Sequence, residues 1–232
     1  MAVRKEQARA GKRNEILSAA RRLVMTKGYE QMTIQDILDE LHISKGAFYH
    51  YFGSKQALLE ALVEGMLEEI KPVLAPVIAD PNLSALEKLR RYFDTAVRWK
   101  RARKDFLIDL MRVWYADDNA IVREKLLVAS SEWVAPQLAA IIRQGIGEGV
   151  LAPAQPERVG EVAWALLQSL GNAMARQLTT GEARSRDIQE VESLVAAYTD
   201  ALERILGAPA GSLQVFDVET LKEWFPVAAG NA

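Results

Sequence analysis

The residues that could do chemistry gather in one stretch, SKGAFYHYFGSK, which spans residues 44–55. Four aromatic rings fall within the five positions from Phe48 to Phe52, with a histidine among them and a lysine near each end. Because Phe48 and Phe52 lie four residues apart, a helix would place both on one face, and we expect them in the core. The side chains between them project elsewhere and carry hydrogen-bonding tips: Tyr49, His50 and Tyr51. On the exposed side of a short helix, such tips can reach phosphates and base edges in a DNA major groove.

Two lysines favour an anionic partner for this stretch. Lys45 and Lys55 each occupy the first position of an expected helix, where a cation is mildly unfavourable. A lysine beside the free backbone N–H groups of a helix start forms an anion site, which a DNA phosphate would occupy favourably. Gly46 leaves the start of the helix bare, so the backbone could approach a base closely. The alternative is that Gly46 relieves crowding against the preceding helix.

The elements that position this stretch follow from spacing and caps. Apolar residues at helical spacing predict a first helix over about 13–27. Thr33 and Asp36 form a capping box, with Asp in place of the usual Glu, and predict a short helix through Leu41. Ser44 is a good N-cap for another short helix. Two short helices joined by a tight turn and braced by a longer helix indicate a helix-turn-helix.

The rest of the chain also shows helical spacing. After a Ser54 cap, a long helix is expected to be kinked or ended by Pro72 and Pro76. Further helices are expected after the Asp80-Pro81-Asn82 turn, from Asp105, and from Asn119 to about Gln144. Two more are expected over roughly 156–180 and 186–206, and a short one after Asp217. No alternation is long enough to predict a strand, and no internal repeat is present. We therefore expect an all-α fold of about nine or ten helices.

Composition excludes several classes of function. The chain has no cysteine, so disulfides, thiolate metal sites and a cysteine nucleophile are absent. Its two histidines, His42 and His50, both fall in the expected helix-turn-helix, and His42 is interpreted as a surface or packing residue of the turn. No glycine-rich phosphate loop and no metal-spaced ligand set occurs, so we expect no enzyme, metal or cofactor. A buried acid pair in the body would keep an enzyme possible. With no long apolar segment, we expect a cytoplasmic, unanchored protein.

Charge is divided unevenly along the 232 residues. The net charge is −2, but residues 1–60 carry ten Lys or Arg against seven Asp or Glu, which gives +3 and leaves −5 for the remainder. A basic N-terminal arm on an acidic body attracts a polyanion at one end only. The alternative is a solvated, disordered terminus.

Residues 14–62, NEILSAARRLVMTKGYEQMTIQDILDELHISKGAFYHYFGSKQALLEAL, resemble the DNA-binding domain of the TetR family of bacterial transcription regulators. The similar motifs are the Gly-Tyr turn, the T-x-x-D-I opening and S-K-G-x-F-Y-x-Y-F-x-S-K. The stretch EGVL at 148–151, followed by two long helices, is similar to the family's C-terminal arrangement. The resemblance implies a helix-turn-helix domain with a basic arm at 1–60 and a helical ligand-binding and dimerisation domain at 61–232.

The resemblance also implies roles for individual residues. Those expected on DNA are Thr33 and Lys55 on phosphate, Lys45, Gly46 and Ala47 on bases, Tyr49 on phosphate or sugar, His50 and Tyr51 on either, and Ser44 beside them. The basic arm, Arg4 to Arg13, is expected along the minor groove or on flanking phosphates.

In the body, the same resemblance implies a ligand pocket and a dimer interface. Candidate pocket residues, which could equally be ordinary core, are Trp99, Phe106, Met111, Trp114, Tyr115, Trp133 and Met174. Candidate interface residues in an intermolecular four-helix bundle, or else in the core of a monomer, are Leu166, Leu170, Ala173, Val195, Tyr198 and Leu202. The cations of 100–104 are either contacts for an anionic ligand or a solvated helix end.

These expectations combine into one functional hypothesis. The chain is expected to be a transcriptional regulator, in the family's usual mode a repressor, that binds a palindromic operator as a homodimer. A small apolar or aromatic ligand would release it by changing the separation of the two recognition helices. A helical interaction protein whose head binds protein remains the alternative, and it predicts no salt-dependent affinity for DNA.

Overall fold

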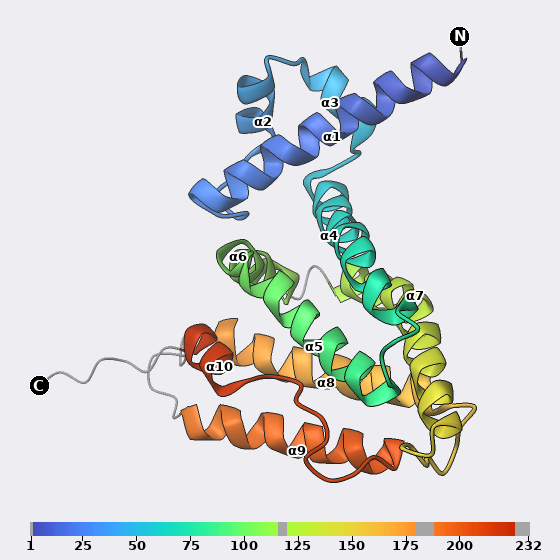
Figure 1. Cartoon of the computed structure of the whole chain (residues 1–232). Helices are drawn as coiled ribbons and strands as arrows, with labels where there is room; N and C mark the ends of the chain where they lie inside the picture. Colours follow the sequence, from blue (N-terminus) through green and yellow to red (C-terminus); the bar gives the residue numbers. More distant parts are fainter. Residues whose placement is uncertain (1, 116–119, 180–187, 226–232) are drawn as a thin grey trace, which may run out of the picture. The chain divides into compact units, whose positions relative to one another are not determined.

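The structure, a computed structural model, describes residues 2–115, 120–179 and 188–225 (Figure 1). These ranges contain ten α-helices and no strand, which confirms the all-α fold. The helices are α1 (Ala2–Lys27), α2 (Ile34–Leu41), α3 (Lys45–Tyr51), α4 (Lys55–Ala79), α5 (Ala85–Arg101), α6 (Lys104–Trp114), α7 (Ala120–Gly147), α8 (Val159–Thr179), α9 (Ile188–Leu206) and α10 (Val218–Trp224). No helix within these ranges is long and apolar enough to cross a membrane.

The chain forms two compact units. The first comprises Met1–Glu68 and Asp105–Leu126, and the second comprises Glu69–Lys104 and Leu127–Ala232. Helices α4 and α7 each contribute residues to both units. The division into domains at residue 60 stays a prediction.

Helix α1 is longer than the sequence pattern predicted. It ends at Lys27, as expected, and the backbone reverses at Gly28, whose φ of +79° suits glycine. However, it begins at Ala2 and not near residue 13, so the predicted start was wrong. The segment before residue 13 lacks an apolar stripe, but Ala, Arg, Lys, Glu and Gln are strong helix formers, and propensity continues the helix there.

Helix α4 begins where its cap predicted and continues through two prolines. The Ser54 hydroxyl accepts a hydrogen bond from the backbone N–H of Ala57 at 3.0 Å. Pro72 and Pro76 lie inside the helix, which runs on to Ala79, so neither proline ends it. Each proline removes one hydrogen bond, and the bonds on either side are sufficient to continue the helix.

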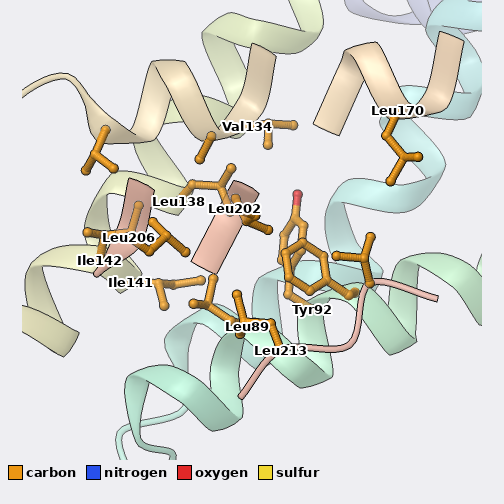
Figure 2. Packing of buried hydrophobic residues seen from close by; sticks show 14 of the residues in the cluster. Leu89, Tyr92, Val134, Leu138, Ile141, Ile142, Leu170, Leu202, Leu206 and Leu213 are labelled. Carbon is orange, nitrogen blue, oxygen red and sulfur yellow. The ribbon is translucent and has the colours of Figure 1, made fainter. Parts of the chain in front are cut away.

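The core of the second unit is formed by α5, α7, α8 and α9 (Figure 2). Leu89, Leu138, Leu170 and Leu202, one from each helix, are almost fully buried. Helices α7 and α8 approach closely at Gly160, where an added Cβ would lie 2.9 Å from the carbonyl oxygen of Ala135. This glycine therefore permits the close contact between the two helices.

The expected helix after Asp217 is present as α10 and packs on the second unit. The Asp217 carboxylate caps it by accepting a hydrogen bond from the backbone N–H of Thr220 at 2.7 Å. The preceding segment is fixed by the buried carboxylate of Glu203, which accepts hydrogen bonds from the backbone N–H groups of Gly211 at 2.9 Å and Leu213 at 2.7 Å. The apolar residues of the C-terminal segment are thus part of the core.

Candidate nucleic-acid interface

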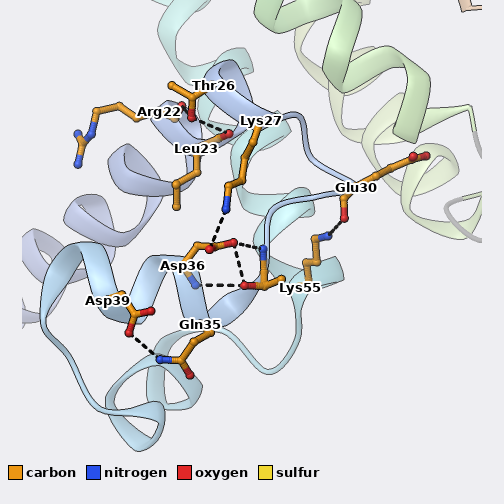
Figure 3. Close-up of polar contacts among 10 residues, drawn as sticks. Arg22, Leu23, Thr26, Lys27, Glu30, Gln35, Asp36, Asp39 and Lys55 are labelled. Atoms are coloured by element: carbon orange, nitrogen blue, oxygen red, sulfur yellow. Dashed lines mark hydrogen bonds and ion pairs between the residues drawn. The ribbon is translucent and has the colours of Figure 1, made fainter.

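The predicted capping box opens helix α2 (Figure 3). The backbone N–H of Thr33 donates to the Asp36 carboxylate at 2.7 Å, and the backbone N–H of Asp36 donates to the Thr33 hydroxyl at 3.1 Å. The ammonium of Lys27, at the end of α1, lies 2.8 Å from the same carboxylate. The hydrogen bond from Lys27, followed by those from Thr33, lowers the pKa of Asp36 to about 2. The start of α2 is therefore tied to α1 by a carboxylate that stays ionised.

The turn between α2 and α3 depends on His42. Its φ of +51° is left-handed, and its backbone N–H donates to the carbonyl of Leu38 at the end of α2. The N–H of Ile43 donates to the same carbonyl at 3.0 Å. The His42 side chain is exposed, so this histidine is a surface residue that closes the turn.

Helix α3 is held in the core by two rings. Its N-cap is Ser44, whose hydroxyl accepts a hydrogen bond from the backbone N–H of Ala47 at 3.2 Å. Phe48 is 0% exposed and Phe52 is 3% exposed, with ring centroids 5.8 Å apart. The structure confirms the prediction that these two rings are core.

The side chains between these rings face outward. Tyr49 is 44% exposed and His50 is exposed, while Tyr51 is half-buried with its ring 5.0 Å from that of His50. Lys45 and Gly46, in the first turn of α3, are also exposed. The outer surface of α3 therefore presents hydrogen-bonding side chains and one cation, while its inner surface is anchored in the core by Phe48 and Phe52.

Gly46 does not relieve crowding. A Cβ built at this position would meet one atom within 4 Å, the Ser44 hydroxyl at 3.9 Å, and nothing from the preceding helix. Since alanine would fit in the free protein, packing does not explain this glycine. The steric alternative is therefore wrong.

Lys55 is braced by contacts that the sequence did not reveal. Its ammonium donates to the carbonyl of Glu30 at 3.1 Å (Figure 3). It also lies 4.4 Å from the ring centroid of Tyr29. The Tyr29 hydroxyl in turn donates to the carbonyl of Lys55 at 2.9 Å. Burial lowers the pKa of Lys55 and raises the pKa of Tyr29 to about 12. The Gly-Tyr turn after α1 thus locks the start of α4, a role that sequence reading missed.

The predicted pocket residues fall in both units. Phe106, Met111, Trp114 and Tyr115 belong to the first unit, with Phe106 buried beneath the guanidinium of Arg21 at 4.9 Å. The second unit holds three more, of which Trp99 and Met174 are buried and Trp133 is half-buried. A cleft of about 290 Å³ lies between α5 and residues 211–217, and no predicted pocket residue lines it. The pocket stays a prediction.

The cations of residues 100–104 engage other protein groups. Arg103 lies 3.3 Å from the Glu69 carboxylate and stacks 4.3 Å from the ring centroid of Trp99. Arg101 pairs with the side-chain carboxylate of Glu223, and the Lys104 ammonium donates to the backbone carbonyl of Glu223. These contacts make part of the cluster an attachment point for α10.

The predicted interface residues divide by burial. Leu170, Val195 and Leu202 are buried within the protomer. Leu166, Ala173 and Tyr198 are half-buried. The Tyr198 hydroxyl lies 2.8 Å from that of Ser169, which links α9 to α8. An interface on these helices would therefore use the half-buried residues and not the whole predicted set.

The first unit contains a helix-turn-helix, a module that places its second helix in the major groove of DNA. Residues 16–62 match the family described as "Bacterial regulatory proteins, tetR family". This segment is therefore similar to the DNA-binding domain of a family whose members are transcription regulators and not enzymes. The family match and the helix-turn-helix together support a DNA-binding transcription regulator.

Curated relatives match part of the chain. The transcriptional repressor DhaR of Mycobacterium sp. (strain GP1) is 24% identical over 135 residues, which cover 58% of this chain and 68% of DhaR. An uncharacterized HTH-type regulator of Lactococcus lactis subsp. lactis is 34% identical over 82 residues, which cover 35% of this chain. The match spans 42% of that relative's own length.

Solved structures match a larger share of this chain than these curated relatives do. A TetR-family transcriptional regulator from Pectobacterium atrosepticum superposes with a TM-score of 0.67 at 22% identity, covering 88% of this chain and 98% of that chain. The TetR-family regulator PfmR from Thermus thermophilus gives a TM-score of 0.51 at 26% identity, covering 83% and 97%. The first of these likenesses concerns the fold alone.

Proposed function

We propose that this chain is a ligand-responsive repressor that binds a palindromic operator as a cytoplasmic homodimer. In this proposal residues 1–60 bind DNA, and residues 61–232 bind a small apolar or aromatic effector and dimerise. The observation that carries it is the outer surface of α3, where Tyr49, His50 and Lys45 are exposed while Phe48 and Phe52 anchor the helix.

Helix α3 reads the operator in this proposal. Lys45, Gly46 and Ala47 meet base edges, and the room around Gly46 allows its backbone to approach a base or a thymine methyl. Tyr49, His50 and Tyr51 contact phosphate, sugar or base. A homodimer would place two such helices in successive major grooves, about 34–36 Å apart.

Phosphate contacts beside α3 fix the register on the duplex. Thr33 was expected to contact phosphate, but its hydroxyl donates to the Asp36 carboxylate at 2.8 Å. In this proposal Thr33 reaches phosphate by exchanging this bond, beside the backbone N–H groups that begin α2. Lys55 reaches phosphate by exchanging the Glu30 carbonyl for a phosphate oxygen.

Dimerisation is supported by the exposed surfaces of α8 and α9. On α8, exposed Val162, Ala165 and Ser169 are small or apolar, and on α9 so are exposed Ala196 and Ala197. Small side chains let helices from two protomers approach closely, as a four-helix bundle requires. The helix pair would then provide half of the bundle.

The effector would act through α4, which contributes residues to both units. A ligand that favours one conformation of the body shifts the separation of the two α3 helices in the dimer. A coupling free energy of about 1–3 kcal/mol gives a 5- to 150-fold change in operator affinity. The seven predicted pocket residues remain the candidates for contacts with the ligand.

The two histidines provide a matched test of the DNA-binding surface. Both His42 and His50 are exposed and both belong to the helix-turn-helix. His50→Asn, combined with Tyr49→Ala, should weaken binding to a selected duplex at least tenfold, as measured by fluorescence anisotropy. His42→Asn keeps a residue that tolerates a left-handed φ and should leave affinity unchanged. Equal affinity in the two variants, both with native circular dichroism, would show that Tyr49 and His50 do not contact the duplex.

A further inference from the structure

Helix α1 extends well beyond the core that it covers. Among its described side chains, which start at residue 9, the first fully buried residue is Ile16, followed by Ala19, Ala20 and Val24, all 0% exposed. The helix begins at Ala2, so at 1.5 Å per residue about 20 Å of helix precedes Ile16. In Figure 1 this part of α1 continues past α3 toward the N-terminus. Burial in the core does not account for residues 9–15 of this helix, none of which is fully buried.

The residue types along α1 change from apolar to basic where the core ends. Arg13 and Arg9 precede Ile16 at intervals of three and four residues, so they continue the register of the buried stripe. Arg9 is exposed, and Lys12 is half-buried and paired with Glu15 at 2.6 Å. Residues 2–13 together carry five basic side chains and one acidic side chain, in a chain whose net charge is −2. A polyanion is the partner that fits the charge of this segment.

The basic part of α1 begins beside the recognition helix. The guanidinium of Arg13 lies 5.3 Å from the ring centroid of Phe52, and Phe52 is the C-cap of α3. A helix that leaves this point lies next to DNA whenever α3 does. The polyanion within reach of this part of α1 is therefore the duplex that α3 binds. The contacts would be with the phosphates that flank the half-site.

We propose that the N-terminal half of α1 is a second DNA-binding element, which binds flanking phosphates as a helix. An extended arm inserted in the minor groove, one of the expectations from the sequence, does not fit. The minor groove is about 6 Å wide, whereas a helix with side chains is about 10–12 Å in diameter. This inference rests on the proposed DNA-binding function.

The first test compares operators with short and long flanks. The selected duplex would carry either three or twelve base pairs beyond each half-site, and binding would be measured by anisotropy over a range of KCl concentrations. Arg9→Gln with Lys12→Gln should lower the salt slope on the long duplex by about 0.9 for each phosphate that is no longer neutralised. On the short duplex, the double variant should bind as the wild type does. Arg158→Gln, at an exposed cation paired with Glu161 in the second unit, is the control for loss of charge.

Gly11 distinguishes a helix from a flexible arm. A Cβ added at Gly11 meets nothing within 4 Å, so Gly11→Ala fits and stabilises the helix. Because α1 is already helical in the free protein, Gly11→Ala should bind the long duplex as tightly as the wild type. Gly11→Pro should weaken binding to the long duplex, since proline breaks the helix interior. An extended arm would bind equally well with proline at this position.

The outcomes separate this inference from the function on which it rests. If the wild type binds the duplex and all the α1 variants match it on long flanks, the inference is overturned while the operator-binding proposal stands. If the double variant loses affinity equally on short and long duplexes, α1 does not bind flanking phosphates. If the folded wild type binds neither duplex, the proposed function fails as well.

Discussion

Lys55→Met separates the two roles of one lysine, phosphate contact and internal brace. Methionine keeps the length and the apolar stem of the side chain and removes the ammonium. In the free protein that ammonium donates to the Glu30 carbonyl at 3.1 Å and lies 4.4 Å from the Tyr29 ring centroid. Losing the hydrogen bond costs about 1 kcal/mol, and losing the cation–π contact costs about 0.5–1 kcal/mol. The free energy of unfolding should therefore fall by about 1–2 kcal/mol.

The effect of the same change on DNA has a different signature. Removing one phosphate contact lowers the slope of log affinity against log salt concentration by about 0.9, so a homodimer with two equivalent lysines should lose about 2. The loss should be similar on selected and scrambled duplexes, because phosphate carries no sequence information. Lys55→Arg keeps the charge and should restore most of the slope.

The assay combines urea unfolding with anisotropy titrations at several KCl concentrations. Lys222→Met, at an exposed lysine of α10, serves as the matched control and should change neither quantity. A fall in stability with an unchanged salt slope would show that Lys55 is a brace only. That result would refute its assignment as a phosphate contact.

Three further changes test how the fold positions these elements. Gly207→Ala should destabilise the protein by about 2–5 kcal/mol in thermal unfolding, since φ is +59° and an added Cβ would lie 2.3 Å from the carbonyl oxygen of Ala152; a native melting temperature would contradict this close approach of the two backbones. Glu203→Ala leaves two backbone amides without their acceptor, at about 1–3 kcal/mol each, and should speed hydrogen exchange in residues 211–213; unchanged protection there would show that the carboxylate does not hold the segment. The pKa of Asp36 is lowered from 3.8 to about 2, so its contribution to stability should be present above about pH 4 and lost as pH falls toward 2. The free energy of unfolding of Asp36→Asn, measured as the pH is lowered, should lack this loss. If the variant and the wild type lose stability identically in acid, the ion pair with Lys27 is not stabilising.

Local signals in the sequence predicted the helix-turn-helix in detail. The caps at Thr33, Ser44 and Asp217 each join atoms no more than three residues apart, so they can be read from short motifs. The burial of Phe48 and Phe52 followed from their spacing alone. Such features depend on little beyond the helix in which they occur.

Features that depend on distant residues were not predictable in this way. The contact of Lys55 with Glu30 joins residues 25 positions apart, and no local pattern contains it. The apolar spacing of α8 and α9 led to the prediction that Leu170 and Leu202 lie at a dimer interface, but both are buried within the protomer. Such spacing shows that a helix face is covered and does not show whether the same chain or a second chain covers it. The start of α1 was missed because an apolar stripe was required, whereas charged residues of high propensity also form helices.

The central claim is that this chain reads a specific duplex as a dimer. The most direct measurement is selection of bound sequences from random duplex DNA by the purified protein, at one fixed salt concentration. The account predicts recovery of a palindrome whose half-sites lie one helical turn apart, about 10–10.5 base pairs between centres. Recovery of no enriched sequence, from protein shown to be folded and free of ligand, would contradict it and favour a head that binds protein.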